Sequence, residues 1–258
     1  MKYEIYYALA CNTGKVRVIN QDNFWCVSEY LQEKNNGLDS LKSGKINSEN
    51  YLAFVVFDGM GGEQYGEMAA YIAAETFDNI YKDKKVVDIK DFLIDSCKQM
   101  NDNITAYAKN KSAECVGTTS AMIMFGKKGI YACNIGDSRI YRYDNKNLNQ
   151  ISKDHVMDIF NDRKPPLTQF LGIPETEFAI EPYIVQESYN NGDCYLICSD
   201  GLTDMLKEDE IKDIISENKN IKICVKILLE KALLNGGRDN ITIILCKIIK
   251  QKTLFGII

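Results

Sequence analysis

The sequence predicts an α+β fold built on antiparallel sheets. Strand-like apolar runs occur in clusters, and helical patterns lie in pairs between the clusters instead of alternating with single strands. Between residues 118 and 151, short turns rich in Gly, Asn and Asp separate neighbouring apolar runs, which is typical of an antiparallel meander. We see no internal repeat and no convincing linker in the 258 residues, so we expect one domain.

The individual elements follow from period-two and period-3.6 patterns. Runs rich in β-branched and aromatic residues predict strands at 3–11, 23–30, 51–57, 118–125, 129–135, 138–144, 178–186, 194–199 and 241–249. Helical spacing predicts helices over 68–80, 88–109, 208–217 and 221–234. The polar stretch 31–50 is interpreted as a long hairpin loop, and 153–171, which contains Pro165-Pro166, is irregular.

Composition and charge exclude several classes of protein. A net charge of −5 argues against a broad surface for nucleic acid or anionic membranes. No apolar run reaches the ~20 residues of a membrane span, and the first residues carry no cleavage signal, so we expect a cytoplasmic protein. Nine cysteines without any C-x-x-C pair indicate reduced core thiols, not disulfides or structural zinc.

Four aspartates lie at the ends of predicted strands: Asp22 in VINQDNFW, Asp58 in AFVVFDGMGG, Asp200 in CYLICSDGL and Asp239 in GGRDNITIIL. A carboxylate at a strand end is held firmly yet reaches solvent, and carboxylates are the ligands of hard cations. Because the chain has one histidine, His155, a metal site would use mainly oxygen ligands, which favours Mg²⁺ or Mn²⁺ over zinc.

A single Asp-Gly pair is more often only a turn. Three glycines close to Asp58, namely Gly59, Gly61 and Gly62, weaken that interpretation because they indicate a close approach of backbones. A peptide carbonyl in such a turn can itself bind a metal. The aspartate spacing does not match an EF-hand.

One rival motif lies near the first aspartate. Cys11 to Arg17 fits C-x₅-R, the phosphate loop of cysteine-dependent tyrosine phosphatases. That chemistry needs a helix after the loop to lower the thiol pKa, whereas NQDNFWCV reads as a strand. We therefore favour a core cysteine before a turn. A Walker-type loop is rejected because Thr13-Gly14-Lys15 lacks the upstream glycine.

The ordered motifs resemble those of the metal-dependent serine/threonine protein phosphatases of type 2C, in a bacterial-type form. In chain order they are Arg17–Asp22, Asp58–Gly62, Gly117–Thr119, Asn134–Arg139, Ser199–Asp204 and Gly237–Asn240, and they extend over about residues 10–247. The resemblance implies a four-layer α-β-β-α sandwich, in which two packed antiparallel sheets are flanked by helix pairs. A catalytically silent relative would have lost a ligand aspartate, and every expected position is occupied.

The resemblance also implies roles for individual residues. Asp58 would bridge two Mn²⁺ or Mg²⁺ ions, with Asp22 and the Gly59 carbonyl on one side and Asp200 and Asp239 on the other. Two such ions activate a bridging water for in-line attack on phosphoserine or phosphothreonine. A third ion would bind at Asp137, together with Asp204, and Arg17 would hold the substrate phosphate.

Two departures from the family pattern stand out. Met60 occupies a position where many eukaryotic members carry a histidine proposed as general acid, so no side chain is assigned to protonate the leaving group; a metal-bound water is our hypothesis. For His155, capping a turn is favoured over catalysis. The region corresponding to the mobile flap, 153–171, is short.

The resemblance and the composition lead to further expectations about partners. We expect phosphorylated proteins as substrates and a Ser/Thr kinase, or its substrates, as the functional counterpart in bacterial signalling. We expect a monomer with no nucleic-acid partner and no membrane span.

Overall fold

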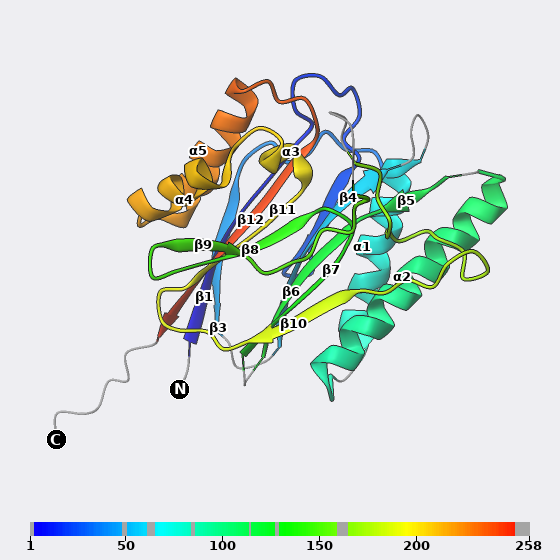
Figure 1. Cartoon of the computed structure of the whole chain (residues 1–258), viewed down its shortest axis with the longest axis horizontal. Coiled ribbons are helices and arrows are strands. Elements are labelled where there is room, and N and C mark those ends of the chain that lie inside the picture. The colour runs from blue at the N-terminus through cyan, green and yellow to red at the C-terminus, as the bar shows by residue number, and fades with distance from the viewer. Residues whose placement is uncertain are drawn as a thin grey trace.

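Two antiparallel sheets pack face to face in the computed structural model, which describes residues 3–47, 51–60, 65–83, 86–113, 115–126, 129–158 and 165–250 (Figure 1). Gly61 and Gly62 of the predicted glycine-rich turn lie outside these residues, as do the first two residues and the apolar tail of the chain.

The two sheets share no strand. The first has the order β3 (Lys42–Asn47), β1 (Tyr3–Asn12), β12 (Ile241–Lys250), β11 (Cys194–Cys198), β8 (Arg139–Asp144) and β9 (Asn147–Gln150). The second has the order β10 (Tyr183–Glu187), β7 (Gly129–Ile135), β6 (Ser120–Gly126), β4 (Leu52–Met60) and β2 (Asp22–Cys26), with the short β5 (Gly117–Thr118) added to β4.

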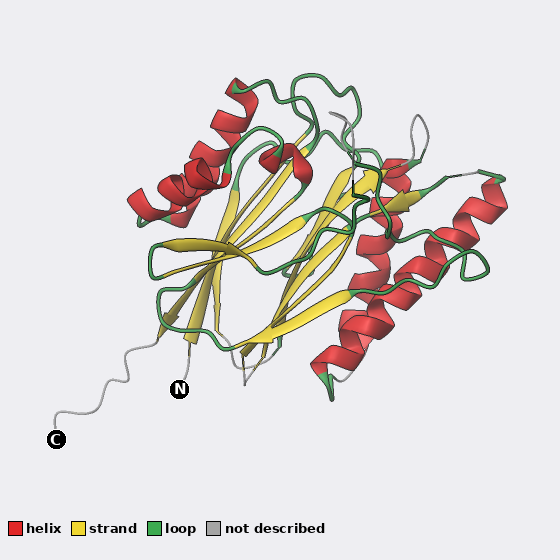
Figure 2. Ribbon diagram, viewed as in Figure 1, coloured by secondary structure: helices red, strands yellow, loops and turns green. Residues whose placement is uncertain are grey.

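Helices cover the outer face of each sheet (Figure 2). The second sheet is covered by α1 (Gly66–Asp83) and α2 (Ile89–Lys111), and the first by α3 (Asp200–Thr203), α4 (Glu208–Glu217) and α5 (Ile221–Leu234). The predicted α+β class and the four-layer α-β-β-α sandwich are confirmed. No helix in the described part of the chain is long and apolar enough to cross a membrane.

The layers explain why the central strands are apolar at nearly every position. In β4, Phe54 and Val56 face the other sheet, while Val55 and Phe57 face α1 and α2. In β12, Ile244 faces the other sheet, and its neighbours on the chain pack on α3–α5. A strand buried on both faces loses the alternation of a half-exposed strand and reads as a continuous apolar run.

Most predicted elements are confirmed to within a few residues. The helices predicted at 208–217 and 221–234 coincide with α4 and α5, and the strand at 129–135 coincides with β7. The strand predicted at 23–30 ends early, at Cys26, because Val27 and Ser28 adopt positive φ in a tight turn. The strand predicted at 178–186 begins only at Tyr183.

The meander predicted over 118–151 is wrong in its connectivity. The β6–β7 and β8–β9 hairpins form as expected, but β7 belongs to the second sheet and β8 to the first. The turn between them, which contains Gly136 at φ +97°, passes from one sheet to the other. Sequence pattern reports turns and strands but not which sheet a strand joins. The crossing carries Asp137 to the edge where Asp58 and Asp200 lie.

The interpretation of 31–50 as a loop misses a strand. Residues Lys42–Asn47 form β3, which pairs with β1 in the first sheet, while β2 and β4 on either side pair with each other in the second. Its polar residues fit an edge strand, where one side meets solvent. The segment 153–171 turns back on itself through a bridge between Val156 and Leu167; residues 159–164 lie outside the described part.

Candidate active site

Asp22 and Asp58 face each other directly across the antiparallel pair of β2 and β4. Such facing positions bring side chains to about 4.5–5.5 Å, where like charges destabilise a sheet. Asp22 is 2% exposed. Burial raises the pKa of Asp22 to about 7, and the charge of Asp239 adds to this, while hydrogen bonds from Thr242 and Ser199 and the contact with Asp58 lower it. A proton or a cation between these carboxyl groups would offset the cost of placing them together.

The two oxygens of Asp22 have different surroundings. Its Oδ2 accepts hydrogen bonds from Ser199 Oγ at 2.8 Å and from Thr242 Oγ1 at 2.7 Å. Its Oδ1 is buried and receives no hydrogen bond from the described residues. A buried carboxylate oxygen without a donor is costly unless a cation occupies that place.

The backbone at Asp58 and Gly59 is fixed from several sides. The Asp58 carbonyl accepts from Thr119 N at 2.9 Å and from Thr118 Oγ1 at 3.0 Å, and Gly59 N donates to Gln21 O at 3.1 Å. A Cβ at Gly59 would lie 2.1 Å from the Gly66 carbonyl oxygen at the start of α1. Only glycine fits, as the predicted close approach of backbones requires.

Asp200 and Asp239 reach the same edge from neighbouring strands of the first sheet. Asp200 follows β11 and opens α3, while Asp239 precedes β12. A Cβ at Gly201 would lie 1.9 Å from the Asn240 carbonyl oxygen, so the end of β11 and the start of β12 pack without space for a side chain.

Arg17 lies beside Asp239 at this edge of the sheets. Its Nη2 is 2.8 Å from Asp239 Oδ2, and the two side chains are 48% and 29% exposed. The hydrogen bond to Asp239 raises the pKa of the guanidinium, so Arg17 is cationic at any working pH.

A cavity of about 290 Å³ unites these groups. It is lined by Arg17, Gln21, Asp58, Gly59, Met60, Thr119, Asp137, Pro165, Pro166, Leu167, Asp200 and Asp239. Six of the eight predicted site residues are among them. Asp22 lies beneath, opposite Asp58, and Asp204 is exposed at the end of α3, outside the lining.

The donors suit a hard divalent cation. They are carboxylates and backbone carbonyls, with no thiolate and no imidazole in the lining. Within the described residues, no three acidic, Cys or His side chains converge on a single point. Backbone oxygen and water would therefore complete the ligand shell, as is usual for Mg²⁺.

Comparisons with known proteins agree with this geometry. The family described as protein phosphatase 2C matches residues 31–221. The chain belongs to the protein phosphatase 2C family. It is a metal-dependent protein phosphatase.

Individual relatives support the assignment. The chain is 29% identical over 218 residues to the serine/threonine phosphatase stp of Listeria welshimeri, covering 77% of this chain and 85% of the relative. It is 28% identical over 254 residues to the serine/threonine protein phosphatase PstP of Mycobacterium tuberculosis, covering 94% of this chain and 45% of the relative.

Solved structures show the same fold. The catalytic domain of PstP in complex with two manganese ions superposes on this chain with a TM-score of 0.76 at 25% identity. The superposition covers 96% of this chain and 100% of the PstP chain. PppA of Pseudomonas aeruginosa, at 23% identity, has a TM-score of 0.78 over 95% of the phosphatase and 100% of that chain.

Sequence reasoning missed the side chains that hold the ligands in place. Asn240 accepts from Gln21 N at 2.8 Å and donates to Thr13 O at 2.9 Å and Ile19 O at 3.0 Å, which fastens the segment 13–21, the one that carries Arg17, to the start of β12. Its position next to Asp239 was a usable signal. Nothing in the sequence pattern points to Ser199 and Thr242 as partners of Asp22.

His155 caps a turn of the phosphatase, as predicted. The Nδ1 atom of its ring accepts a hydrogen bond from Gly136 N at 3.2 Å, and its backbone N–H donates to Gly136 O at 3.0 Å. Burial lowers the pKa of the imidazole. His155 is not in the cavity lining, so it fixes the turn that carries Asp137 instead of facing the reaction.

The thiol alternative does not fit the structure. Cys11 is buried at the end of β1, and burial raises its pKa to about 12. Its Sγ accepts from Thr242 Oγ1 at 3.2 Å and Asn20 Nδ2 at 3.3 Å, and β2 follows the loop where a phosphate loop needs a helix. All nine cysteines are free and eight are buried, which confirms the prediction of core thiols.

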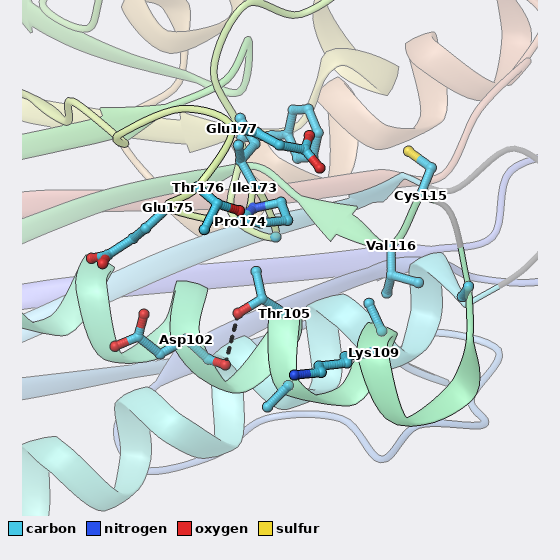
Figure 3. A pocket seen from close by; sticks show the side chains of 15 residues that line it. Asp102, Thr105, Lys109, Cys115, Val116, Ile173, Pro174, Glu175, Thr176 and Glu177 are labelled. Atoms are coloured by element: carbon cyan, nitrogen blue, oxygen red, sulfur yellow. Dashed lines mark hydrogen bonds between the residues drawn. The ribbon is translucent and has the colours of Figure 1, made fainter.

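A larger cleft, of about 680 Å³, lies between α2 and the loop 170–177, and none of the four aspartates of the smaller cavity lines it. Figure 3 shows its walls, with Thr105 and Lys109 on the helix and Pro174 and Glu177 on the loop. None of the predicted site residues lines this cleft.

Proposed function

We propose that the Arg17–Asp58–Asp200–Asp239 pocket hydrolyses phosphoserine and phosphothreonine in proteins, with divalent cations held by its carboxylates. The observation that carries this proposal is the Asp22–Asp58 pair. Two carboxyl groups face each other across β2 and β4, and one buried oxygen of Asp22 has no donor among the described residues. Asp58 of this pair lines a pocket that also contains an arginine. The relatives stp and PstP are serine/threonine phosphatases, which supports the substrate class.

The roles of the ligands remain those that the family resemblance implies. Asp58 would contact two ions, with Asp22 and the Gly59 carbonyl toward one and Asp200 and Asp239 toward the other. Manganese in the related PstP structure supports Mn²⁺, and the oxygen donors suit Mg²⁺ equally. When bound, the ions offset the repulsion among the carboxylates and lower the pKa of a water between them.

The protein's own residues would keep the ligands in fixed orientations. Ser199 and Thr242 occupy one oxygen of Asp22, so only the other can turn to an ion. The bonds from Thr118 and Thr119 to the Asp58 carbonyl hold the carboxylate at the strand end. Such outer partners typically contribute 10–100-fold to metal affinity or activity.

Arg17 is the proposed phosphate-binding group. Its guanidinium is half exposed at the pocket, and Asp239 holds it there. A planar guanidinium matches two phosphate oxygens at once. An incoming phosphate would compete with Asp239 for this arginine, while Asp239 would turn to an ion.

Protonation of the leaving serine or threonine is assigned to water. Met60 lines the pocket at the position where many eukaryotic members of the family carry a histidine, and a thioether has no proton to give. His155 is outside the lining and engaged with Gly136.

Asp137 and Asp204 are the residues proposed to bind a third ion. Asp137 lines the pocket and Asp204 lies one helical turn after Asp200, which supports a third site in their neighbourhood.

One core between the sheets takes side chains from both, which supports a single catalytic domain over 1–258. We infer phosphorylated proteins and a cognate Ser/Thr kinase as partners, and a monomer in the bacterial cytoplasm; the named bacterial relatives support the source.

The deciding experiment is a metal titration with matched peptides. Phosphoserine, phosphothreonine and phosphotyrosine peptides of one sequence are assayed with Mn²⁺, with Mg²⁺ and with chelator. We expect metal-dependent release of phosphate from the first two and none with chelator. Chelator-resistant activity that Cys11→Ser destroys would contradict the proposal.

A matched pair of variants tests the assignment of residues. Asp58→Asn should reduce turnover more than about 100-fold, since it removes a proposed direct ligand and even outer partners contribute 10–100-fold. Asp158→Asn, an exposed aspartate outside the lining, is the control and should behave like the wild type.

A further inference from the structure

Three large apolar side chains are exposed on the loop that carries Arg17. Val16, Val18 and Ile19 are 64%, 91% and 53% exposed. They lie within residues 13–21, which we call the Arg17 loop. Clustered apolar exposure is a mark of an interaction site, whereas single exposed residues are ordinary.

The backbone of the Arg17 loop is firmly held, so its exposed side chains are presented by a fixed support. Lys15 N donates to Gly237 O at 2.7 Å, and Asn240 binds the carbonyls of Thr13 and Ile19. At Gly14, where φ is +83°, a Cβ would lie 2.2 Å from the Asp239 carbonyl oxygen. The loop therefore cannot turn these side chains inward without breaking its contacts with the 237–240 segment.

Apolar groups also border the pocket elsewhere. Pro165, Pro166 and Leu167 line the same cavity as Arg17, and Met157 beside them is 53% exposed and donates its N–H to Pro166 O at 3.0 Å. The pocket is thus lined by four aspartates and by apolar residues of the 165–167 segment, while Val16, Val18 and Ile19 flank Arg17 outside the lining.

The position of this surface identifies its occupant. Arg17 is the proposed phosphate ligand, and Val18 is its neighbour, about 3.8 Å away between Cα atoms. An extended peptide advances about 3.3 Å per residue. A substrate whose phosphate reaches Arg17 would therefore place residues one or two positions from the phosphorylated residue against Val16, Val18 or Ile19.

We propose that the Arg17 loop selects phosphorylated segments with apolar residues directly beside the phosphoserine or phosphothreonine, and that Val18 makes the main contact. This rests on the proposed function of the pocket. Val18 acts on substrate choice and is separate from the reacting groups.

The test compares peptides with an aryl phosphate, which has no flanking residues. Wild type, Val18→Ser and Val18→Leu are assayed on phosphothreonine peptides whose neighbouring residues are Leu/Val or Ser/Gly, and on p-nitrophenyl phosphate. Val87→Ser is the matched control, because Val87 is 88% exposed but lies before α2, away from the pocket.

We expect the wild type to prefer the apolar peptide in kcat/KM. Val18→Ser should lose about tenfold on that peptide, corresponding to about 1.4 kcal/mol, which is the order expected for covering one valine side chain. It should change little on the polar peptide and the aryl phosphate. Val18→Leu should keep the preference, and Val87→Ser should match the wild type.

Three outcomes would overturn the proposal. A wild type that hydrolyses the aryl phosphate but shows no preference between the peptides overturns the role of the loop alone. Hydrolysis of neither substrate class overturns the pocket assignment as well. The third outcome is a wild type that is a dimer and a Val18→Ser variant that is a monomer with unchanged selectivity. That result would assign the surface to contact with a second copy of the chain.

Discussion

At the scale of single residues, the site depends on carboxylates placed where their charges repel. Asp22 and Asp58 face each other, and Asp239 raises the pKa of Asp22 further. Ser199 and Thr242 offset part of this with hydrogen bonds to one oxygen. A bound cation would offset the electrostatic repulsion that remains among these carboxylates, so the same clustering that is unfavourable without metal favours metal binding.

The Arg17–Asp239 contact leads to a prediction on substrate binding. Arg17→Ala should raise KM for an aryl phosphate about tenfold or more with a smaller effect on kcat, because a binding group is removed. Stability should change little, since exposed ion pairs contribute about 0–1 kcal/mol. Steady-state kinetics checks this, with Arg238→Ala, an exposed arginine outside the pocket lining, as control. An unchanged KM would contradict the phosphate-binding role.

The thiols lead to a second prediction at this scale. Burial raises the pKa of Cys11 to about 12, so its thiol stays protonated at neutral pH and is poorly reactive. Iodoacetamide should therefore modify only Cys115, the one exposed cysteine, and activity should persist. Mass spectrometry and an activity assay check this, with Cys115→Ser as the unlabelled control. Inactivation that depends on Cys11 would restore the thiol mechanism.

At the scale of elements, the site forms where loops and strand ends from both sheets meet. Asn240 joins the start of β12 to the Arg17 loop through three hydrogen bonds, and Gly59 and Gly201 allow backbones to touch. The edge that carries the proposed ligands is therefore stabilised by backbone contacts that need specific small or amide side chains.

Removing the Asn240 side chain should loosen that edge. Asn240→Ala leaves three backbone groups without their partner, and we expect the free energy of unfolding to fall by about 3 kcal/mol, at about 1 kcal/mol per bond. KM should rise as well, because the loop that carries Arg17 is released. Urea unfolding and kinetics check this. Asn235→Ala, which removes one exposed hydrogen bond to Met205 O, is the control and should cost less than about 1 kcal/mol. Equal losses in both variants would contradict the role of Asn240.

At the scale of the whole molecule, metal binding should stabilise the sandwich because the proposed ligands come from both sheets. At a concentration 100 times the dissociation constant, a ligand adds about 2.7 kcal/mol. For a chain of this size that corresponds to a rise in Tm of about 5–10 °C. Thermal unfolding with Mn²⁺ and with chelator measures it. Asp58→Asn should lose most of the shift, and an equal shift in that variant would place the ions elsewhere.

Much of the fold could be predicted because its signals are local. Helices α4 and α5 have clear amphipathic spacing, and β4, β6 and β12 are apolar runs bounded by turn residues. What failed was long-range. The β7–β8 turn looks like a hairpin but crosses between sheets, and β3 looks like a loop but completes the edge of the first sheet. Pairing partners are chosen by tertiary packing, which leaves little trace in a short polar segment.

Local patterns along the chain were sufficient to predict the α+β class and, through the order of the motifs, the family, and they also predict an oxygen-rich ligand set. Composition, turn chemistry and motif order are properties of neighbouring residues, so they can be read along the chain. Packing of the two sheets established what local patterns could not: Asp22 is buried opposite Asp58, Ser199 and Thr242 are its hydrogen-bond partners, and β3 pairs with β1. Each of these depends on groups far away in sequence, because burial and hydrogen-bond partners exist only once the two sheets have packed.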